Sequence, residues 1–531
     1  MRRKMERRML AVGIFLLLFA GVINLRLYAI LDTELYRTAG TAQGRYTVRA
    51  GTVNGQIYDR NLEKLVHRET VLTAVVNPTP EAIALLTGHA LDPEVVRKAI
   101  PKGKPFVCQV DTAEIACDDI AVFETPVRYG ADRLAAHVIG YVQNGAGVSG
   151  LEASYDTFLR EQERSNIVTY SVNGQGGLLE GMARTVQAAE PMTAGVVTTL
   201  DARIQSICES AAAQMPSGAV VVLEVETGEV LAMVSTPVFD AVNLAASLED
   251  SRAPFLNRAL CAYSVGSVFK IVTAATALQN GIPLHYMHVC DGKAQVGTQS
   301  FRCHDRNGHG LLDMAAAMTH SCNTYFISLS QALEPEAMRR TADAFGFGRP
   351  TVLADGITGA AGNLPDLAAL SVPAERANFS FGQGKLTATP IQVAMMTCAV
   401  ANNGSMPLPN LVRGVTEDGF TITGQRDPGT AIVMSEAIAR QVQILLTAAV
   451  QDNPASKARP DNTTAAGKTS TAQTGQYAPD GTEYCHAWMT GYFPVEKPKY
   501  VVTVFVENGG SGNTAAAPVF REIAEKITNG D

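Results

Sequence analysis

The sequence predicts an α+β fold whose antiparallel sheet gathers strands from two distant parts of the chain. Two apolar segments, 218–225 and 230–235, are joined by Glu-Thr-Gly-Glu, which is typical of a β-hairpin. Two more apolar strands are expected at 487–492 and 500–507, and helical patterns dominate from 269 to about 333. Strands at both ends with helices between them indicate a layered α+β domain.

At 531 residues the chain is too long for one compact domain. We expect a cytoplasmic tail and membrane anchor at 1–31, an extended N-terminal domain at 32–190 and a larger C-terminal domain at 191–531. The formal net charge of -8 argues against a nucleic-acid-binding protein, because such a protein needs a basic face to meet phosphates.

Within the N-terminal domain, the residue pattern predicts a strand at 70–77 and short helices at 81–88 and 92–100. A further helix is expected at 151–160. The segment 162–193 is polar and shows little periodicity, so no regular element is expected there.

A basic segment precedes a long apolar run at the N-terminus. The run extends from Met9 to Ile23 and continues through Arg26 and Tyr28 to Leu31, which reaches the roughly 20 residues that a membrane span requires. A cleaved signal peptide has the same order of charged and apolar residues, but no small-x-small cleavage site follows. We therefore expect an uncleaved single-pass anchor. A cytoplasmic N-terminus and an extracytoplasmic remainder follow from the basic residues before the run, which are Arg2, Arg3, Lys4, Arg7 and Arg8.

Nine cysteines are spread over the chain, and none forms a Cys-x-x-Cys pair. The spacing typical of zinc sites is therefore absent, and the sequence predicts neither a metal site nor a cofactor. Cys108 with Cys117, and Cys290 with Cys303, are candidate disulfide pairs. Single buried cysteines are the commoner alternative.

The first candidate catalytic motif is Ser267-Val268-Phe269-Lys270, the only Ser-x-x-Lys in the chain. The apolar stretch 271–278 predicts a buried helix with Ser267 at its N-terminus and Lys270 one turn further on. A serine hydroxyl needs a base to become a nucleophile. A lysine can be that base only if its pKa falls about three units from roughly 10.4, which burial and a second cation nearby would achieve.

The second motif is Ser321-Cys322-Asn323. Ser-x-Asn alone carries no information, because Ser171-Val172-Asn173 and Ser511-Gly512-Asn513 share it and helix capping is the ordinary role of such residues. Its place between two other motifs gives it weight. Ser321 would relay a proton to a leaving amine, and Asn323 would hold a substrate carbonyl.

The third motif, 467–472, contains the only Lys-Thr pair and is expected to be an edge strand that lines a cleft. Lys468 would bind a substrate carboxylate and supply the second cation, and Thr469 would hydrogen-bond the same carboxylate. The backbone N–H groups of Thr471 and Ser267 would form an oxyanion hole. An isolated exposed lysine is otherwise an ordinary solvated residue.

In this order, the three motifs resemble those of penicillin-binding proteins and serine β-lactamases. The chain as a whole is similar to the class B penicillin-binding proteins, the monofunctional D,D-transpeptidases of cell elongation, division and sporulation. The resemblance implies a penicillin-binding transpeptidase fold, an antiparallel sheet with helices on both faces, preceded by the membrane anchor and a pedestal domain. The flanking segments that share this likeness are 55–61, 137–152, 218–240, 257–259, 263–266, 308–310, 321–326, 381–384, 389–392, 401–404, 486–488 and 507–510.

The third motif departs from the family at Ser470, where glycine is usual. The added hydroxyl is expected to crowd bulky β-lactam side chains. The resemblance implies two sets of functional residues. The catalytic set is Ser267, Lys270 and Ser321, and the substrate-binding set is Asn323, Lys468, Thr469, Ser470 and Thr471.

The resemblance also implies the reaction. Peptidoglycan stem peptides ending in D-Ala-D-Ala, and β-lactam antibiotics, would acylate the serine without a cofactor, and a membrane glycan polymerase would be a partner. Two alternatives are a D,D-carboxypeptidase or β-lactamase, which needs a positioned water, and a membrane β-lactam sensor, which needs a cytoplasmic signalling segment.

Overall fold

The computed structural model describes residues 2–31, 44–175, 177–179 and 182–530. The chain forms two compact units, and neither is continuous in sequence. The domain boundaries expected near 31 and 190 stay a prediction. Unit 1 consists of Met1–Asn54, Glu69–Val127 and Glu163–Met192, and unit 2 consists of Gly55–Arg68, Arg128–Gln162 and Thr193–Asp531.

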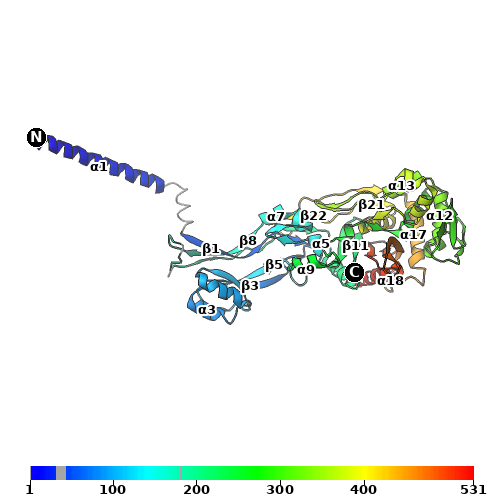
Figure 1. Cartoon of the computed structure of the whole chain (residues 1–531), viewed down its shortest axis with the longest axis horizontal. Coiled ribbons are helices and arrows are strands. Elements are labelled where there is room, and N and C mark those ends of the chain that lie inside the picture. The colour runs from blue at the N-terminus through cyan, green and yellow to red at the C-terminus, as the bar shows by residue number, and fades with distance from the viewer. Residues whose placement is uncertain (1, 32–43, 176, 180–181, 531) are drawn as a thin grey trace. The chain divides into compact units, whose positions relative to one another are not determined.

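The N-terminal helix α1 (Arg2–Leu31, Figure 1) is long and apolar enough to cross a membrane. Its 30 residues extend for about 45 Å, more than the roughly 30 Å of a bilayer's hydrocarbon core. The side-chain amide of Asn24 donates to the Ala20 carbonyl at 2.8 Å, so this polar group is satisfied within the helix. By length and composition, α1 is a single-pass anchor, as expected from the sequence.

In addition to the anchor helix, unit 1 contains two three-stranded antiparallel sheets. The expected strand and the two expected short helices are present as β3, α3 and α4, and the helices pack their apolar residues on the sheet. The expectation that 162–193 contains no regular element is wrong, because this segment contains β8 and β9. The sheets are β1 (Arg45–Val53), β8 (Arg164–Ser171) and β9 (Thr185–Gln187), and β4 (Phe106–Val110), β3 (Glu69–Val76) and β5 (Ile120–Val127); the helices are α3 (Pro80–Leu86) and α4 (Pro93–Ala99).

Unit 2 is built around a five-stranded antiparallel sheet whose strands come from both ends of the unit, as the sequence predicts. The third motif lies on β24, which is the last strand in this order. From one edge to the other, the strands are β12 (Val230–Thr236), β11 (Gly218–Glu224), β26 (Tyr500–Val506), β25 (Glu483–Phe493) and β24 (Ala466–Tyr477).

Both faces of this sheet are covered, which explains why its central strands are apolar without alternation. Along β11, Val221 belongs to the larger hydrophobic core, whereas Val220 and Val222 belong to a second core. Helix α16 (Pro390–Ala401) contacts the sheet in the first core, and α8 (Ala202–Ala212) and α19 (Ala517–Thr528) contact it in the second.

Elsewhere in unit 2 the sequence-based expectations were partly wrong. The region expected to be helical from 269 to 333 contains four short strands between its helices, because glycines and polar residues interrupt the apolar pattern there. The expected helix at 151–160 is divided at Tyr155. The elements concerned are α6 (Gly150–Ser154), α7 (Asp156–Glu161), α10 (Lys270–Gln279), β14 (His288–Cys290), β15 (Lys293–Val296), β16 (Gln299–Arg302), β17 (Gly310–Leu312), α11 (Met314–Thr319) and α12 (Asn323–Gln331).

The remaining helices and strands of unit 2 lie outside the five-stranded sheet. They are β2 (Gln56–Tyr58), α5 (Ala136–Ile139), β6 (Val142–Gln143), β7 (Ala146–Gly147), β10 (Gly195–Thr198), α9 (Leu244–Glu249), β13 (Tyr263–Ser264), α13 (Pro335–Ala344), β18 (Thr351–Ala354), β19 (Ile357–Gly359), α14 (Leu367–Leu370), α15 (Pro373–Ser380), β20 (Thr387–Ala388), β21 (Ser405–Pro407), β22 (Val412–Thr416), β23 (Thr430–Ile432), α17 (Glu436–Val450) and α18 (Gly512–Ala515).

Trp488, the only tryptophan in the chain, joins the sheet to the segment before the first motif. Its side chain on β25 is fully buried, and its Nε1–H donates to the Ser264 carbonyl at 2.9 Å. We expect Trp488→Phe to lower the free energy of unfolding of unit 2 by about 2 kcal/mol, because it removes a buried donor and leaves a small cavity. Denaturant unfolding followed by circular dichroism measures the change. Tyr484→Phe on the same strand is the control, and an equal loss in both variants would contradict the assigned role.

Candidate active site

Ser267 lies on a tight turn that leads directly into α10. The turn, Gly266–Phe269, is a single 3-10 turn, and Gly266 has a φ of 58°, which a glycine adopts without strain. The N–H of Gly266 donates to the Gly382 carbonyl at 2.9 Å. A Cβ atom at Gly266 would lie 2.4 Å from the hydroxyl oxygen of Ser470. The serine is therefore presented at the N-terminus of a buried helix, where the sequence placed it.

Lys270 is fully buried one turn after Ser267, and three oxygen atoms surround its Nζ. Nζ lies 2.6 Å from the Ser321 carbonyl oxygen, 2.8 Å from Asn323 Oδ1 and 3.2 Å from Ser321 Oγ. The first two oxygens can only accept a hydrogen bond, whereas the hydroxyl can also donate one to a neutral amine. Burial, and then the charge of Lys468, hold the pKa of Lys270 well below its usual value.

The second motif holds this lysine through an unusual backbone turn. Ser321 has a φ of 51°, a left-handed conformation that costs a non-glycine residue about 1–2 kcal/mol. Cys322 then serves as the N-cap residue of α12, and Asn323 is the first residue of that helix. The turn directs both the carbonyl and the hydroxyl of Ser321 toward Nζ of Lys270.

The residues of the third motif alternate between the two faces of strand β24. Thr469 and Thr471 are the more exposed residues of this part of the strand, and Lys468 and Ser470 alternate with them on the buried face. Lys468 is 2% exposed, and its Nζ donates to the Thr469 carbonyl at 2.9 Å. Burial lowers the pKa of Lys468 to about 8.

These residues converge on one cleft of about 660 Å³ within unit 2. Lys270 and Lys468 are buried and do not line the cleft themselves, but both contact or neighbour residues that do. The structure therefore brings all eight predicted site residues into one neighbourhood, although their individual roles stay predictions. The predicted residues that line the cleft are Ser267, Ser321, Asn323, Thr469, Ser470 and Thr471.

The hydroxyl of Ser470 makes a hydrogen bond that the sequence did not predict. It donates to the Val265 carbonyl at 2.8 Å, and the residue is only 3% exposed. The hydroxyl is therefore used to join β24 to the segment before Ser267. The expectation that it crowds a bulky ligand stays a prediction, because Ser470 also lines the cleft.

Sequence reasoning missed several groups at the site. Ser511 and Asn513 form a Ser-x-Asn match that nothing in the sequence assigned to the site, yet both line the cleft, and Gly512 between them allows the chain to approach β24 closely.

The sequence-based expectation that the chain has no metal site was also incomplete. Three cysteines and a histidine place their ligand atoms within 4.8 Å of one another next to the second motif: Cys290, Cys303, His309 and Cys322. Within the described residues, which include all nine cysteines, every cysteine is a free thiol, so neither candidate disulfide is formed.

Comparison with known protein families agrees with the geometry. Residues 218–525, more than half of the chain, match the family model of the penicillin-binding protein transpeptidase domain. The chain belongs to this family. The matched segment begins at β11 and ends within α19, so it includes all three motifs of the site.

Curated relatives place this penicillin-binding protein in class B. Peptidoglycan D,D-transpeptidase MrdA of Haemophilus influenzae is 26% identical over 99% of this chain and 92% of its own length. Stage V sporulation protein D of Bacillus subtilis is 29% identical over 88% of this chain and 77% of its own length. Several of the curated relatives, MrdA among them, are named as peptidoglycan D,D-transpeptidases, and the chain is a class B penicillin-binding protein with D,D-transpeptidase chemistry.

Solved structures give the same result for the fold. A chain from a study titled "Structural coordination of polymerization and crosslinking by a peptidoglycan synthase complex" is 26% identical, with a TM-score of 0.72 and 97% of each chain covered. A ceftriaxone acyl-enzyme of penicillin-binding protein A from M. tuberculosis is also 26% identical, with a TM-score of 0.58 over 63% of this chain and 80% of that one.

The hydrogen bond of Ser470 generates a prediction opposite in sign to the steric one. We expect Ser470→Ala to slow acylation by penicillin by about tenfold at most, because loss of one buried hydrogen bond is worth roughly 1.4 kcal/mol. Stopped-flow acylation rates measure the effect for small and bulky β-lactams alike. Ser470→Thr, which keeps the hydroxyl, is the control. Faster acylation of Ser470→Ala by bulky cephalosporins would support the crowding interpretation instead.

The lowered pKa of Lys468 generates a pH dependence. The ammonium form is present below about pH 8 and is lost above it, so attraction of a ligand carboxylate weakens as the pH rises through that value. We expect the second-order acylation rate constant, which reports the free enzyme, to fall on the alkaline side near pH 8. Lys468→Arg should lose this alkaline limb, since arginine keeps its proton. An identical limb in both proteins would show that another group titrates.

Proposed function

We propose that the chain cross-links peptidoglycan as a membrane-anchored D,D-transpeptidase in which Ser267 is the nucleophile and Lys270 is its base. The observation that carries the assignment is the position of Lys270, which is fully buried one turn after Ser267 with Nζ 3.2 Å from Ser321 Oγ. Burial and the charge of Lys468 hold its pKa well below the usual value, so its amine gives up a proton more readily than that of an exposed lysine. The curated relatives named as D,D-transpeptidases favour this function over a hydrolase or a sensor.

In the acylation step, Ser267 Oγ attacks the carbonyl between the two terminal D-alanines of a stem peptide. Its proton passes to Lys270, and a new ester bond forms at Ser267. The negative charge that develops on the carbonyl oxygen would be stabilised by the N–H groups of Ser267 and Thr471. Ser321 then relays the proton to the departing nitrogen, so the peptide bond breaks and D-alanine leaves as an amine.

In the second step, the amine of a neighbouring stem peptide attacks the ester. A new peptide bond forms, and the proton returns from the amine to Ser267 through Lys270 and Ser321. Asn323 would hold the substrate carbonyl. Thr469 would hydrogen-bond the substrate carboxylate, while Lys468 attracts it from beneath the cleft and keeps the pKa of Lys270 low. β-Lactams would acylate Ser267 by the same first step.

The partner and the orientation belong to the same proposal. The similar chain in a complex described as coordinating polymerization and crosslinking supports a membrane glycan polymerase as the partner. The basic residues at the start of α1 support a cytoplasmic N-terminus, which puts the cleft on the side where peptidoglycan is built.

The assignment of the nucleophile and base is tested by covalent labelling. We expect a fluorescent penicillin to label the wild-type chain, with the adduct mapped by mass spectrometry to the peptide that contains Ser267. Ser267→Ala should lose the label completely. Lys270→Arg should also be acylated at least about a hundredfold more slowly, because arginine cannot accept the proton.

Two results would overturn the mechanism. One is an adduct on a residue other than Ser267. The other is near wild-type acylation of Lys270→Arg, which would mean that the lysine supplies only charge. Ser405→Ala, in a strand of unit 2 outside the cleft, is the matched control and should label normally.

A further inference from the structure

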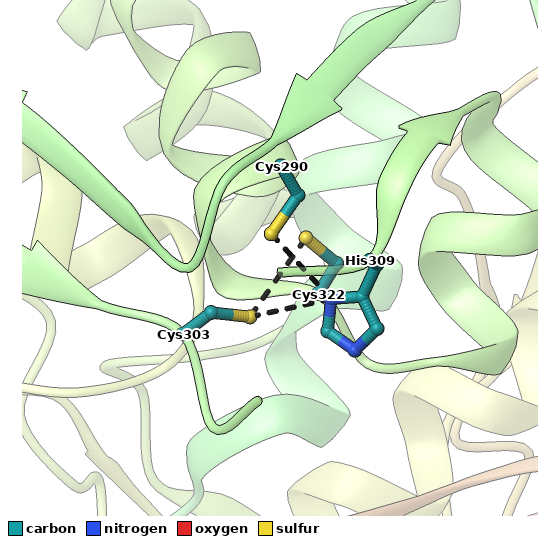
Figure 2. A group of neighbouring side chains, drawn as sticks. All are labelled: Cys290, Cys303, His309 and Cys322. Atoms are coloured by element: carbon teal, nitrogen blue, oxygen red, sulfur yellow. Dashed lines mark hydrogen bonds between the residues drawn. The ribbon is translucent and has the colours of Figure 1, made fainter. Parts of the chain in front are cut away.

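Four metal-ligating side chains meet beside the second motif, outside the groups that the proposed reaction uses. Figure 2 shows Cys290, Cys303, His309 and Cys322 pointing toward one another from separate segments. The three cysteines are buried, and the histidine is partly buried. Cys290 ends β14, Cys303 follows β16, His309 precedes β17, and Cys322 caps α12.

Three of the six distances among the ligand atoms match a tetrahedral zinc site, and all six are at most 4.8 Å. Zn–S bonds of about 2.3 Å and Zn–N bonds of about 2.0 Å give edges of about 3.8 Å between two sulfurs and about 3.5 Å between sulfur and nitrogen. Nδ1 of His309 lies 3.5 Å from Cys290 Sγ and 3.6 Å from Cys303 Sγ. Cys303 Sγ lies 3.9 Å from Cys322 Sγ, far from the roughly 2.05 Å of a disulfide.

Two glycines allow the backbone around the cluster to pass close to itself. Gly292 and Gly308 have φ values of 90° and 80°, and a Cβ at either would lie 2.2–2.3 Å from a backbone oxygen. The N–H of Cys303 donates to the Gly292 carbonyl at 2.9 Å. These contacts fold the segment between Cys290 and His309 back on itself, which brings residues far apart in sequence to one point.

Hydrogen bonds to the sulfur atoms provide the outer support that metal-bound thiolates usually have. Nδ1 of His304 lies 3.9 Å from Cys303 Sγ. The hydroxyl of Thr324 lies 3.3 Å from Cys322 Sγ. Donors aimed at sulfur favour the thiolate form, which is the form that binds a metal.

We propose that Cys290, Cys303, His309 and Cys322 bind one Zn²⁺ in a closed structural site. Three thiolates and one imidazole are a common ligand set of structural zinc, and four protein ligands leave no position for a substrate or water. Binding releases the three thiol protons and leaves a net charge of -1 on the centre. Zinc is preferred to an iron–sulfur cluster, since one donor is a histidine and the four atoms fit a single ion.

The site also has a consequence for the cleft, and this step rests on the proposed function. Cys322 stands between Ser321 and Asn323, the two residues that hold Lys270. A metal bond at Cys322 would fix the turn in which Ser321 keeps its left-handed backbone. The zinc is thus a positioning element for the second motif and takes no part in proton transfer.

Metal analysis of the full chain in detergent tests the site without reference to activity. We expect about one zinc per chain by elemental mass spectrometry. Replacement by Co²⁺ should give the visible d–d absorption of a tetrahedral site together with thiolate-to-cobalt charge transfer. Cys303→Ser and His309→Ala should each weaken Zn²⁺ binding at least about tenfold, because loss of an outer partner alone costs that much.

Cys261→Ser is the matched control. Cys261 is a half-buried thiol of unit 2 outside the cluster, and its Sγ donates to the Asn257 carbonyl, which a serine can also do. This variant should retain zinc fully. Bound iron, an octahedral cobalt spectrum, the same zinc content in Cys303→Ala as in wild type, or a Cys303–Cys322 disulfide in the purified chain would each overturn the proposal.

The effect on the cleft is measured separately. Chelation of the wild-type chain should slow penicillin acylation at least about tenfold without changing its far-ultraviolet circular dichroism, and Zn²⁺ but not Mg²⁺ should restore the rate. An unchanged rate in zinc-free protein would overturn the positioning role. If penicillin does not acylate the zinc-loaded chain at all, the proposed function fails, whereas the metal content still decides the site.

Discussion

Burial of the Lys270 amine sets the conditions for every other group in the cleft. Transferring an ammonium ion out of water costs several kcal/mol, so the buried group tends to lose its proton. The loss is useful only if Nζ remains beside the hydroxyls that exchange protons with it. Two oxygen atoms of Ser321 and one of Asn323 contact Nζ and hold it in this position. Helix α10, which is buried from Lys270 to Leu278, and the strained turn at Ser321 keep this nitrogen atom away from water and fixed in place.

The sheet supplies the rigidity that this arrangement needs. Because β11, β26 and β25 are buried on both faces, β24 is held in register by strands that cannot shift without exposing two cores. Cross-connections then fix the nucleophile turn to the sheet: the Ser470 hydroxyl to Val265, and the Trp488 indole to Ser264. The position of Ser267 is thus determined by strands that lie about 200 residues later in the chain.

The sequence was sufficient for features with a local pattern. The apolar runs of β11, β12, β25 and β26 predicted the sheet, and the three motifs located the cleft. Features that depend on long-range proximity could not be predicted. Strand β8 has the polar Asn166 on its buried side and the apolar Ile167 on the other, so its alternation was weak. The metal-ligating cluster joins residues 290 to 322, a region whose helical pattern concealed the loops between its strands. The hydrogen bond of the Ser470 hydroxyl could not be predicted because its partner, Val265, is remote in sequence.

The interleaving of the two units limits how the catalytic part can be separated from the rest. Strand β10 pairs with β2 on one side and β22 on the other, and β2 belongs to the segment Gly55–Arg68, well before the family-matched region. A chain that starts at Thr193 would leave one side of a fully buried strand with open N–H and C=O groups, which is a template for aggregation. It would also lose Asp59, whose carboxylate accepts the N–H of Ala202 at 3.1 Å. For gene fusion or domain shuffling, the smallest transferable piece therefore begins upstream of Gln56, so the segments Glu69–Val127 and Glu163–Met192 of unit 1 are inherited together with the enzyme.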